Sequence, residues 1–261
     1  MNNVTLNRPI AVFDAGIGSY AIARKIADRF PGQDVLYFAD RASFPYGGKG
    51  RTELLAVMRR TIERLESFGP AAIVIASNAP SVMVLDDLKD WSPTPIIGVF
   101  PPVRRALDTS VTKRITVLGV ASLISSSEIR GYVGRESAGQ GNVDLVSASD
   151  LVELVENSKF LTDPETTLAA VRAKLGTLHP DTDVATLSST HLPWLLRYFE
   201  QAGPRLRFLD PADDVVAAVG SYATPGSGTF RTLVSEREGY DLGDFQRMLA
   251  RLGLDLTIER V

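Results

Sequence analysis

The sequence of 261 residues contains no cysteine. This absence excludes disulfide bonds, metal sites built on thiolates and every mechanism that uses a cysteine nucleophile. Histidine is also scarce, since His179 and His191 are the only two. Two histidines without a spaced acidic cluster do not make a zinc site, so we expect no metal.

The chain also lacks long apolar runs and an excess of charge of one sign. No apolar run approaches the length needed to cross a bilayer, and the start, MNNVTLNRPIAVFDAG, has none of the parts of a signal peptide. The 28 basic and 31 acidic residues are spread evenly, with a formal net charge of −3. No basic stripe indicates a nucleic-acid partner. We therefore expect a soluble cytoplasmic protein that binds neither a membrane nor nucleic acid.

What is present is a regular alternation of apolar runs and helix-period segments, which is typical of parallel α/β proteins. With 44% hydrophobic residues, the chain can bury a sizeable core. Strands are expected at Ile10–Phe13, Val35–Phe38, Ala72–Ile75, Pro95–Gly98, Ile115–Gly119, Val143–Val146, Val184–Leu187 and Leu206–Leu209. Amphipathic helical segments include Tyr20–Phe30, Glu53–Phe68, Pro164–Leu175 and His191–Gln201.

The two halves of the chain resemble each other. RPIAVFDAG is echoed by KRITVLGVA, and AIVIASNAPSV by DVATLSSTHLPWL. The offset is 105 residues from Ile10 to Ile115 and 112 residues from Ser77 to Ser189. Such similar spacing predicts an internal pseudo-repeat.

The repeat predicts an α/β fold of two pseudo-twofold-related parallel-sheet lobes with the active-site cleft between them. Prolines mark the expected crossings, so the first lobe would span residues 1–98 plus 211–261 and the second 99–210. Ligands of such sheets bind beyond the carboxyl ends of the strands. Asp14, Ser77 and Ser189 would then surround one shared cleft.

The turn after the first strand allows another interpretation. Gly16-x-Gly18-x-x-Ala21 matches the dinucleotide fingerprint, and Asp40 follows at about the right distance for a ribose hydroxyl. Against an NAD-dependent oxidoreductase, Asp14 places a carboxylate at the turn that must receive a pyrophosphate. The dinucleotide interpretation is therefore the weaker one.

Two further segments carry candidate residues. FPYGGKG, residues 44–50, is either a solvated tight turn or a loop that holds an anion through Tyr46 and the amides of Gly47 and Gly48. LVELVENSKF carries Glu153 and Glu156 within a helical period. Each glutamate is either solvated or placed to orient a histidine or to serve as an acid.

Several motifs in one order resemble glutamate racemase, within the cofactor-independent aspartate/glutamate racemase superfamily. The family shows Asp-Ser-Gly-x-Gly-Gly, Tyr-Phe-x-Asp, Pro-Tyr-Gly, Ala-Cys-Asn-Thr-Ala, Leu-Val-Glu and Gly-Cys-Thr-His-Tyr-Pro. The corresponding segments here are Asp14-Ala15-Gly16-Ile17-Gly18-Ser19, Tyr37-Phe38-Ala39-Asp40, Pro45-Tyr46-Gly47, Ala76-Ser77-Asn78-Ala79-Pro80, Leu154-Val155-Glu156 and Ser188-Ser189-Thr190-His191-Leu192-Pro193. The resemblance covers nearly the whole chain.

The resemblance implies an isomerase that racemises a small acidic amino acid without a cofactor, supplies D-glutamate for peptidoglycan, and is compatible with a homodimer. Two thiols would stand where this chain has Ser77 and Ser189. Asp14 and His191 would tune them, and Glu156 would support the histidine. The substrate's amino group and carboxylates would be held by Asn78, Ala79, Thr190, Pro45, Tyr46 and Gly47.

How much of the family's activity this chain can have depends on Ser77 and Ser189. A thiol with a pKa of about 8.5 ionises at a cost of about 2 kcal/mol near neutral pH. A group as weakly acidic as water, with a pKa of about 16, costs about 12 kcal/mol at ~1.36 kcal/mol per unit. A residual deficit of about 5 kcal/mol slows a step more than a thousandfold. Two-thiol racemisation is therefore not expected of this chain.

Two origins fit the serines: engineered replacement of cysteines, or a natural homologue that lost thiol chemistry. Further departures at Ala15, Ser19, Ala79, Pro80 and Ser188, and Ser149 where the family often has cysteine, indicate a divergent subfamily. The alternative to a racemase is a non-catalytic ligand-binding or regulatory homologue. A third interpretation is an isomerase, decarboxylase or hydrolase that pairs one serine with His191.

Overall fold

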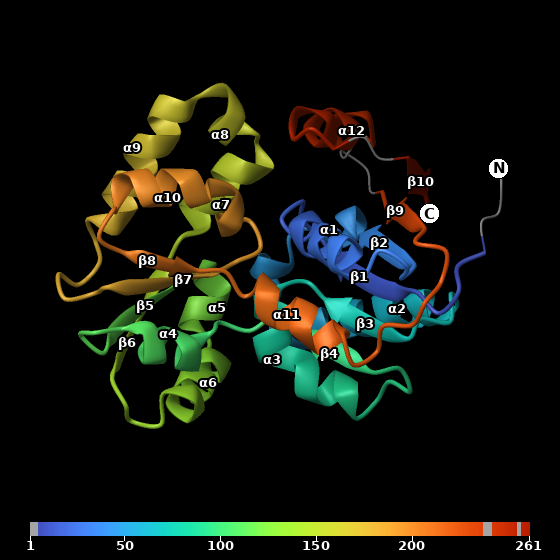
Figure 1. Cartoon of the computed structure of the whole chain (residues 1–261), viewed down its shortest axis with the longest axis horizontal. Helices are drawn as coiled ribbons and strands as arrows, with labels where there is room; N and C mark the ends of the chain where they lie inside the picture. Colours follow the sequence, from blue (N-terminus) through green and yellow to red (C-terminus); the bar gives the residue numbers. More distant parts are fainter. Residues whose placement is uncertain (1–4, 237–241, 255–256) are drawn as a thin grey trace. The chain divides into compact units, whose positions relative to one another are not determined.

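The computed structural model describes residues 5–236, 242–254 and 257–261. The chain divides into two compact units (Figure 1). The first unit comprises Met1–Val99 and Ala212–Val261, and the second comprises Phe100–Pro211. Each unit is a parallel β-sheet with helices on both faces, so the predicted class of two parallel-sheet α/β lobes is confirmed.

The sheet of the first unit has six parallel strands in the order β10-β9-β2-β1-β3-β4. Every residue of β1, β2 and β3 is buried, as expected for strands that helices cover on both faces. The chain passes from β1 to β2 on one side and then to β3 on the other. The strands are β1 (Ile10–Asp14), β2 (Val35–Ala39), β3 (Ala72–Ile75), β4 (Ile96–Gly98), β9 (Phe230–Val234) and β10 (Ile258–Arg260).

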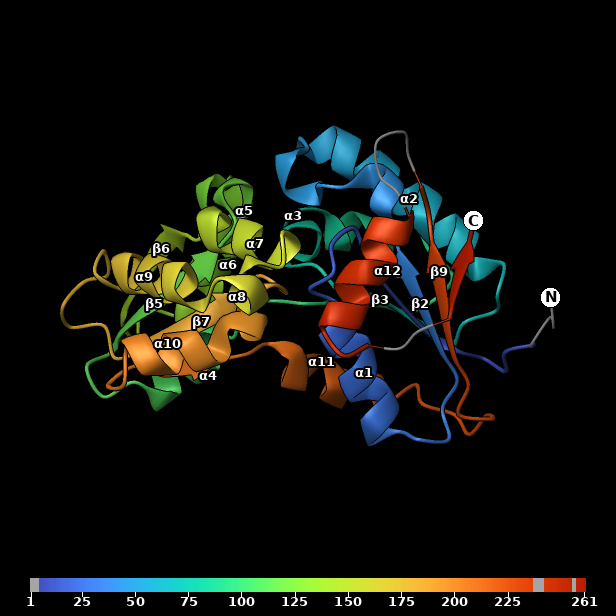
Figure 2. The same ribbon diagram turned by 90° about the horizontal axis from the view of Figure 1, so that it is seen from above.

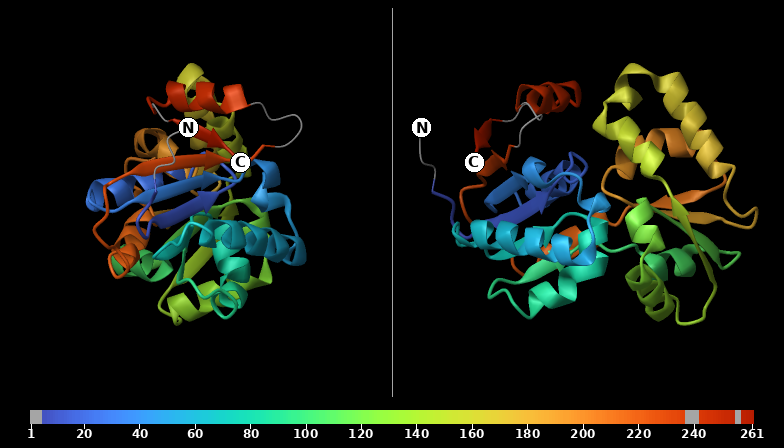
Figure 3. Two further views of the ribbon diagram at one scale, coloured as in Figure 1. Left: turned by 90° about the vertical axis from the view of Figure 1, so that its right-hand side faces the viewer. Right: turned by 180° about the vertical axis from the view of Figure 1, so that it is seen from behind.

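Helices α1 and α11 lie side by side on one face of this sheet, and α2 and α3 lie together on the other (Figures 2 and 3). α2 forms because Leu54, Val57, Met58 and Leu65 recur at helical spacing and are buried against the sheet. The helical segments are α1 (Tyr20–Arg29), η1 (Arg41–Ser43), η2 (Tyr46–Gly48), α2 (Arg51–Glu66), α3 (Asn78–Lys89), α11 (Ala212–Val219) and α12 (Leu242–Arg251).

The second unit has four parallel strands in the order β6-β5-β7-β8. Helices α7, α9 and α10 cover one face, and α4 and α6 the other (Figure 1). The strands are β5 (Arg114–Gly119), β6 (Asn142–Ser147), β7 (Val184–Ser188) and β8 (Arg207–Leu209). The helical segments are α4 (Val103–Thr109), α5 (Ala121–Ser125), α6 (Ser127–Ser137), α7 (Ser149–Glu156), α8 (Lys159–Thr162), α9 (Pro164–Leu175), η3 (Leu192–Leu195) and α10 (Leu196–Ala202).

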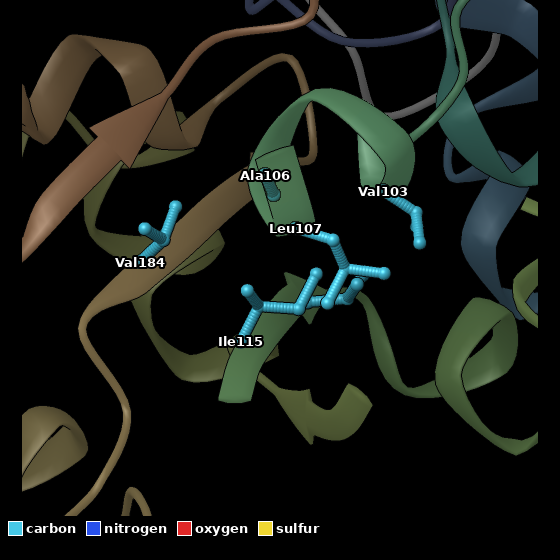
Figure 4. Packing of buried hydrophobic residues seen from close by; sticks show 6 residues of the cluster. Val103, Ala106, Leu107, Ile115 and Val184 are labelled. Carbon is cyan, nitrogen blue, oxygen red and sulfur yellow. The ribbon is translucent and has the colours of Figure 1, made fainter. Parts of the chain in front are cut away.

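The core of the second unit forms where α4 packs on its sheet. Val103, Ala106 and Leu107 of α4 pack against Ile115 of β5 and Val184 of β7 (Figure 4). These α4 residues are spaced three and four positions apart, so they lie on one face of the helix. Burial of that face against the sheet stabilises this short helix.

The order β6-β5-β7-β8 repeats the order β2-β1-β3-β4 of the first unit. The register repeats as well, since Ile10 of β1 pairs with Ala72 of β3 and Ile115 of β5 pairs with Val184 of β7. Because Ser77 lies five residues after Ala72 and Ser189 five residues after Val184, the two serines occupy corresponding positions. The predicted internal repeat is thus present at the level of single residues.

All eight predicted strands are present, and their ends differ from the prediction by at most one residue. The prediction of one helix over His191–Gln201 is wrong in its first turn. The segment opens as a 3₁₀ turn, in which the Trp194 amide donates to the His191 carbonyl at 3.1 Å, and α10 follows. Strands β9 and β10 were not predicted.

Candidate active site

Asp14 ends β1, which lies next to β3 in the first unit. The side chain is only 3% exposed, and its Oδ1 accepts a hydrogen bond from the Ala15 amide at 2.7 Å. The chain changes direction across the sheet between these two strands, and ligands of open parallel sheets bind beyond the carboxyl ends of strands at such a point. Asp14 therefore lies where this fold places functional groups.

Asp40, at the end of β2, is held by three hydroxyl groups. Its Oδ2 accepts from Tyr46 at 2.9 Å and Thr61 at 3.2 Å, and its Oδ1 accepts from Ser235 at 2.9 Å. Both carboxylate oxygens are thus engaged inside the unit, and the side chain is buried. The assignment of Asp40 to a ribose hydroxyl in the dinucleotide interpretation is wrong for this reason.

Tyr46 lies buried in η2 and donates its hydroxyl hydrogen to Asp40. Burial raises the pKa of Tyr46 well above its usual value, and the negative charges of Asp40 and Asp14 raise it further. The phenol therefore stays neutral, with its hydroxyl committed to Asp40. Contact of Pro45, which is exposed, and of Gly47 with a substrate stays a prediction.

The first turn of α3 brings Ser77, Asn78 and Ala79 to the carboxyl end of β3. Asn78 is 3% exposed, and its Nδ2 donates to the Val99 carbonyl at 3.1 Å. Its Oδ1 is buried and has no hydrogen-bond partner among the described residues. A buried acceptor left unpaired costs about 1–3 kcal/mol, so this oxygen indicates a place for a ligand donor.

In the second unit, Ser189, Thr190 and His191 follow β7 and are each less than 8% exposed. His191 Nε2 lies 2.5 Å from Oε1 of Glu156, the last residue of α7. Glu153, one turn earlier, is exposed, whereas Glu156 contacts the histidine. In the described part of the chain no hydrogen bond joins Ser189 to His191, and a pairing of one serine with His191 stays a prediction.

The serines that depart from the family pattern differ in what their hydroxyls do. Ser19 bonds Tyr37 at 3.1 Å, Ser149 accepts from the Ala121 amide at 2.9 Å, and Ser188 bonds Thr186 at 2.7 Å. The hydroxyls of Ser77 and Ser189 make no hydrogen bond to any described residue. These two corresponding serines keep their hydroxyls available, whereas the other three are used inside the units.

The supporting residues Thr61, Ser235 and Val99 were not predicted. Ser235 lies 195 residues from Asp40 in the sequence, so no local pattern joins them. Searches of the described residues find no group of acidic and histidine side chains that could hold a metal ion. No helix among them is long and apolar enough to span a membrane.

The fold and these residues define a class of α/β protein in which two sheets of one strand order carry polar groups at corresponding strand ends. The glutamate racemase of Granulibacter bethesdensis is 35% identical over 214 residues, covering 79% of this chain and 75% of that protein. The glutamate racemase of Gloeothece citriformis is 30% identical over 211 residues, covering 80% of this chain and 75% of that protein. This chain belongs to the glutamate racemase family.

Solved structures of glutamate racemases have the same fold as this chain. Glutamate racemase from Thermus thermophilus, in complex with β-chloro-D-alanine, superposes with a TM-score of 0.83 at 26% identity, covering 97% of this chain and 96% of that one. Glutamate racemase from Bacillus anthracis gives a TM-score of 0.85 at 23% identity, covering 98% and 97%, and shows the shared fold. No family model matches this chain.

Proposed function

We propose that this chain binds a small acidic amino acid, or a related carboxylate, on the glutamate racemase scaffold and lacks thiol-based racemisation as it stands. The observation that carries the proposal is the pair Ser77 and Ser189. They occupy corresponding positions after corresponding strands, and neither hydroxyl is used inside its unit. Hydroxyls therefore stand where the family resemblance places the two thiols.

The ligand class follows from the groups around these serines. Asn78 Oδ1, a buried acceptor without a described partner, suits the ammonium group of an amino acid. Amides at the start of α3, next to Ala79, suit a carboxylate, because a helix N-terminus carries partial positive charge. The contacts proposed for Thr190, Pro45, Tyr46 and Gly47 rest on the family resemblance. A family relative of known structure is a complex with an amino-acid derivative, β-chloro-D-alanine.

The acid–base groups of the family scaffold are retained. Asp14 is buried at the end of β1, and His191 and Glu156 form a pair. In the proposed ancestral mechanism these groups tune two thiols, with no cofactor. With serines, an alkoxide must form at a cost of about 12 kcal/mol, against about 2 kcal/mol for a thiolate. The retained groups cannot offset that difference on both faces of the α-carbon.

The cleft between the two lobes, the homodimer and the role in cell-wall synthesis stay predictions of the family resemblance. Binding and catalysis are separable, because a site that binds the ground state and the transition state equally well does not accelerate the reaction. The proposal therefore makes two claims, one about affinity for acidic amino acids and one about rate.

The test is exchange of the α-proton of L- and D-glutamate in heavy water, followed by NMR. The unmodified chain is compared with Ser77→Cys plus Ser189→Cys. We expect the double variant to exchange the α-proton more than about a thousandfold faster, as a barrier lowered by at least about 5 kcal/mol requires. Ser19→Cys plus Ser149→Cys is the matched control, because these hydroxyls serve internal hydrogen bonds, and we expect no gain.

Two results would count against the proposal. Exchange by the unmodified chain within tenfold of the double cysteine variant would show that the serines suffice for catalysis. No exchange by the double variant with any acidic amino acid, together with no binding of L- or D-glutamate by the unmodified chain, would overturn the ligand class.

A further inference from the structure

Ser77 is the N-cap residue of α3. Its backbone is extended, with φ −149° and ψ 128°, which is the conformation that an N-cap adopts. An N-cap serine normally turns its hydroxyl onto the amide of the second or third helical residue and satisfies that donor. The Ser77 side chain makes no such bond.

Two other helices of this chain show the ordinary behaviour. Ser126 caps α6 by accepting from the amide of Ile129 at 3.1 Å. Asp163 caps α9 by accepting from the amide of Thr166 at 3.1 Å. In both helices the partner is the amide of the third helical residue. Ser19 and Ser158, the N-cap residues of α1 and α8, make no such side-chain bond, and their backbones are right-handed and left-handed helical rather than extended. Ser126, whose backbone is extended like that of Ser77, is bonded to the amide of its third helical residue.

The third helical residue of α3 is Pro80, which has no amide hydrogen. The donor that captures Ser126 and Asp163 is thus missing for Ser77. A proline is tolerated here because the amides of a first helical turn have no partner within the helix. The proline leaves the helix intact and the hydroxyl of its cap residue unused.

The backbone around Ser77 is fixed by other groups. Ser81 Oγ accepts from the Val99 amide at 2.8 Å and contacts the Ser77 carbonyl at 2.7 Å. The Val99 carbonyl holds the Asn78 amide group, whose Oδ1 stays unpaired at 3% exposure of the residue. Two acceptors on consecutive residues, Ser77 Oγ and Asn78 Oδ1, are thereby held in one turn without described partners.

The amide of Ala79, the second helical residue, is present, but the Ser77 side chain makes no bond to it. We propose that Pro80 is a positioning residue that keeps the Ser77 hydroxyl available to a ligand by removing the amide of the third helical residue. The inference rests on the proposed function, and it names the ligand group as a hydrogen-bond donor such as the ammonium of an amino acid. Sulfur is a weak acceptor, so the competition with the helix arises once serine stands at this position. Ser77 and Pro80 then act as a matched pair.

The test is a double-mutant cycle of the full chain with Ser77→Ala, Pro80→Ala and the double variant. Pro80→Ala supplies the missing amide, so Ser77 should cap α3. We expect Pro80→Ala to raise the folding equilibrium constant from urea unfolding about fivefold more with Ser77 present than in the Ser77→Ala background. That factor is the ~1 kcal/mol of an N-cap. The Ser77→Ala background removes the effects of proline on the unfolded chain.

Binding of L- and D-glutamate is measured on the same four proteins by calorimetry. Pro80→Ala should weaken binding about fivefold when Ser77 is present, because the capped hydroxyl must first be released. In the Ser77→Ala background, the same substitution should leave affinity unchanged.

A folding cycle that is additive within error overturns the role of Pro80, even if glutamate binds. A non-additive folding cycle also overturns that role if Pro80→Ala leaves the affinity for glutamate unchanged. The free hydroxyl of Ser77 would then not contact the ligand. If the folding cycle is non-additive and no variant binds glutamate, the capture of Ser77 is supported and the proposed ligand class is overturned.

Discussion

The two units share one strand order and one register, yet they place different titratable side chains near corresponding strand ends. Ile10 corresponds to Ile115, so Asp14 at the end of β1 corresponds to Gly119 at the end of β5. A Cβ atom at Gly119 would lie 3.1 Å from Ile124, 3.2 Å from Leu123 and 3.3 Å from the Ser188 carbonyl. A side chain at this position therefore requires these neighbours to shift by a few tenths of an ångström. The titratable pair of the second unit is Glu156 and His191, from α7 and the segment after β7.

The supporting contacts differ in the same way. In the first unit Asp40 gathers hydroxyls from three separate segments and fixes η2 through Tyr46. In the second unit Tyr198 and Arg197 of α10 donate to the carbonyl of Phe160, just beyond Glu156. The repeat therefore preserves the scaffold and the two serine positions, while the titratable side chains near the strand ends and the residues that support them are specific to each unit.

The largest expected effect on stability comes from placing in the second unit the aspartate that the first unit has at the corresponding position. Gly119→Asp places a side chain against Leu123 and Ile124 and buries a charge, and we expect a loss of about 4 kcal/mol in the free energy of unfolding. Gly119→Ala, the steric control, should cost about 1–3 kcal/mol. Urea unfolding measures both. If Gly119→Asp is as stable as the unmodified chain, the second unit tolerates a carboxylate at this position. The difference from Asp14 in the first unit would then not be steric.

A smaller effect concerns Asp34 and Asp183, which fasten the amino ends of strands in the first and second units. Burial alone would raise the pKa of each carboxyl, but hydrogen bonds outweigh it and lower the pKa below the usual value. Asp34 accepts from the amides of Asn7, Ser227 and Thr229, and Asp183 from Ser110 and the amides of Val111 and Thr112.

Because these pKa values are lowered on folding, the stabilisation is present above the unfolded pKa of about 3.9 and is lost as pH falls through the folded value. Asp34→Asn and Asp183→Asn should each cost about 1–3 kcal/mol at neutral pH and flatten the loss of stability in acid. Urea midpoints between pH 2 and pH 7 measure this for each variant. An acid dependence unchanged in both variants would show that other carboxyls control it.

The smallest effect is spectroscopic. An ionised carboxylate only accepts hydrogen bonds, so Glu156 should hold neutral His191 as the tautomer protonated at Nε2. Glu156→Gln, which can donate as well as accept, should weaken that preference while changing stability by less than about 1 kcal/mol. Nitrogen-15 NMR reports the tautomer, and exposed His179 is the internal reference. An unchanged His191 spectrum would show that Glu156 does not orient the ring.

The sequence predicted the parts of this molecule that rest on local pattern. The strands that end at Asp14 or precede Ser77 and Ser189 are fully buried, and the sequence pattern located their ends within one residue. Strand β9, in which two of the five residues are polar, was not predicted. Ser235, which follows β9 and completes the contacts of Asp40, is near Asp40 only in the folded structure.

The choice between Glu153 and Glu156 shows the same limit. Helical periodicity placed both on one helix, but only the structure shows that Glu156, at the helix end, reaches His191. The contacts of Asn78, Thr190 and the Pro45–Gly47 loop with a ligand stay predictions. The sequence marked Pro80 only as a departure from the family pattern, because its meaning depends on the cap geometry of α3.

The contact between Ser235 and Asp40 has a consequence for synthesis on the ribosome. The second unit, Phe100–Pro211, is one continuous stretch, so all of it is made before Ser235 and strand β9 exist. Domains generally fold as units while the chain emerges. The second unit can therefore complete its fold first, while the buried carboxylate of Asp40 must wait for a hydroxyl that is synthesised after that unit. Of these two units, the one that is begun first is finished second.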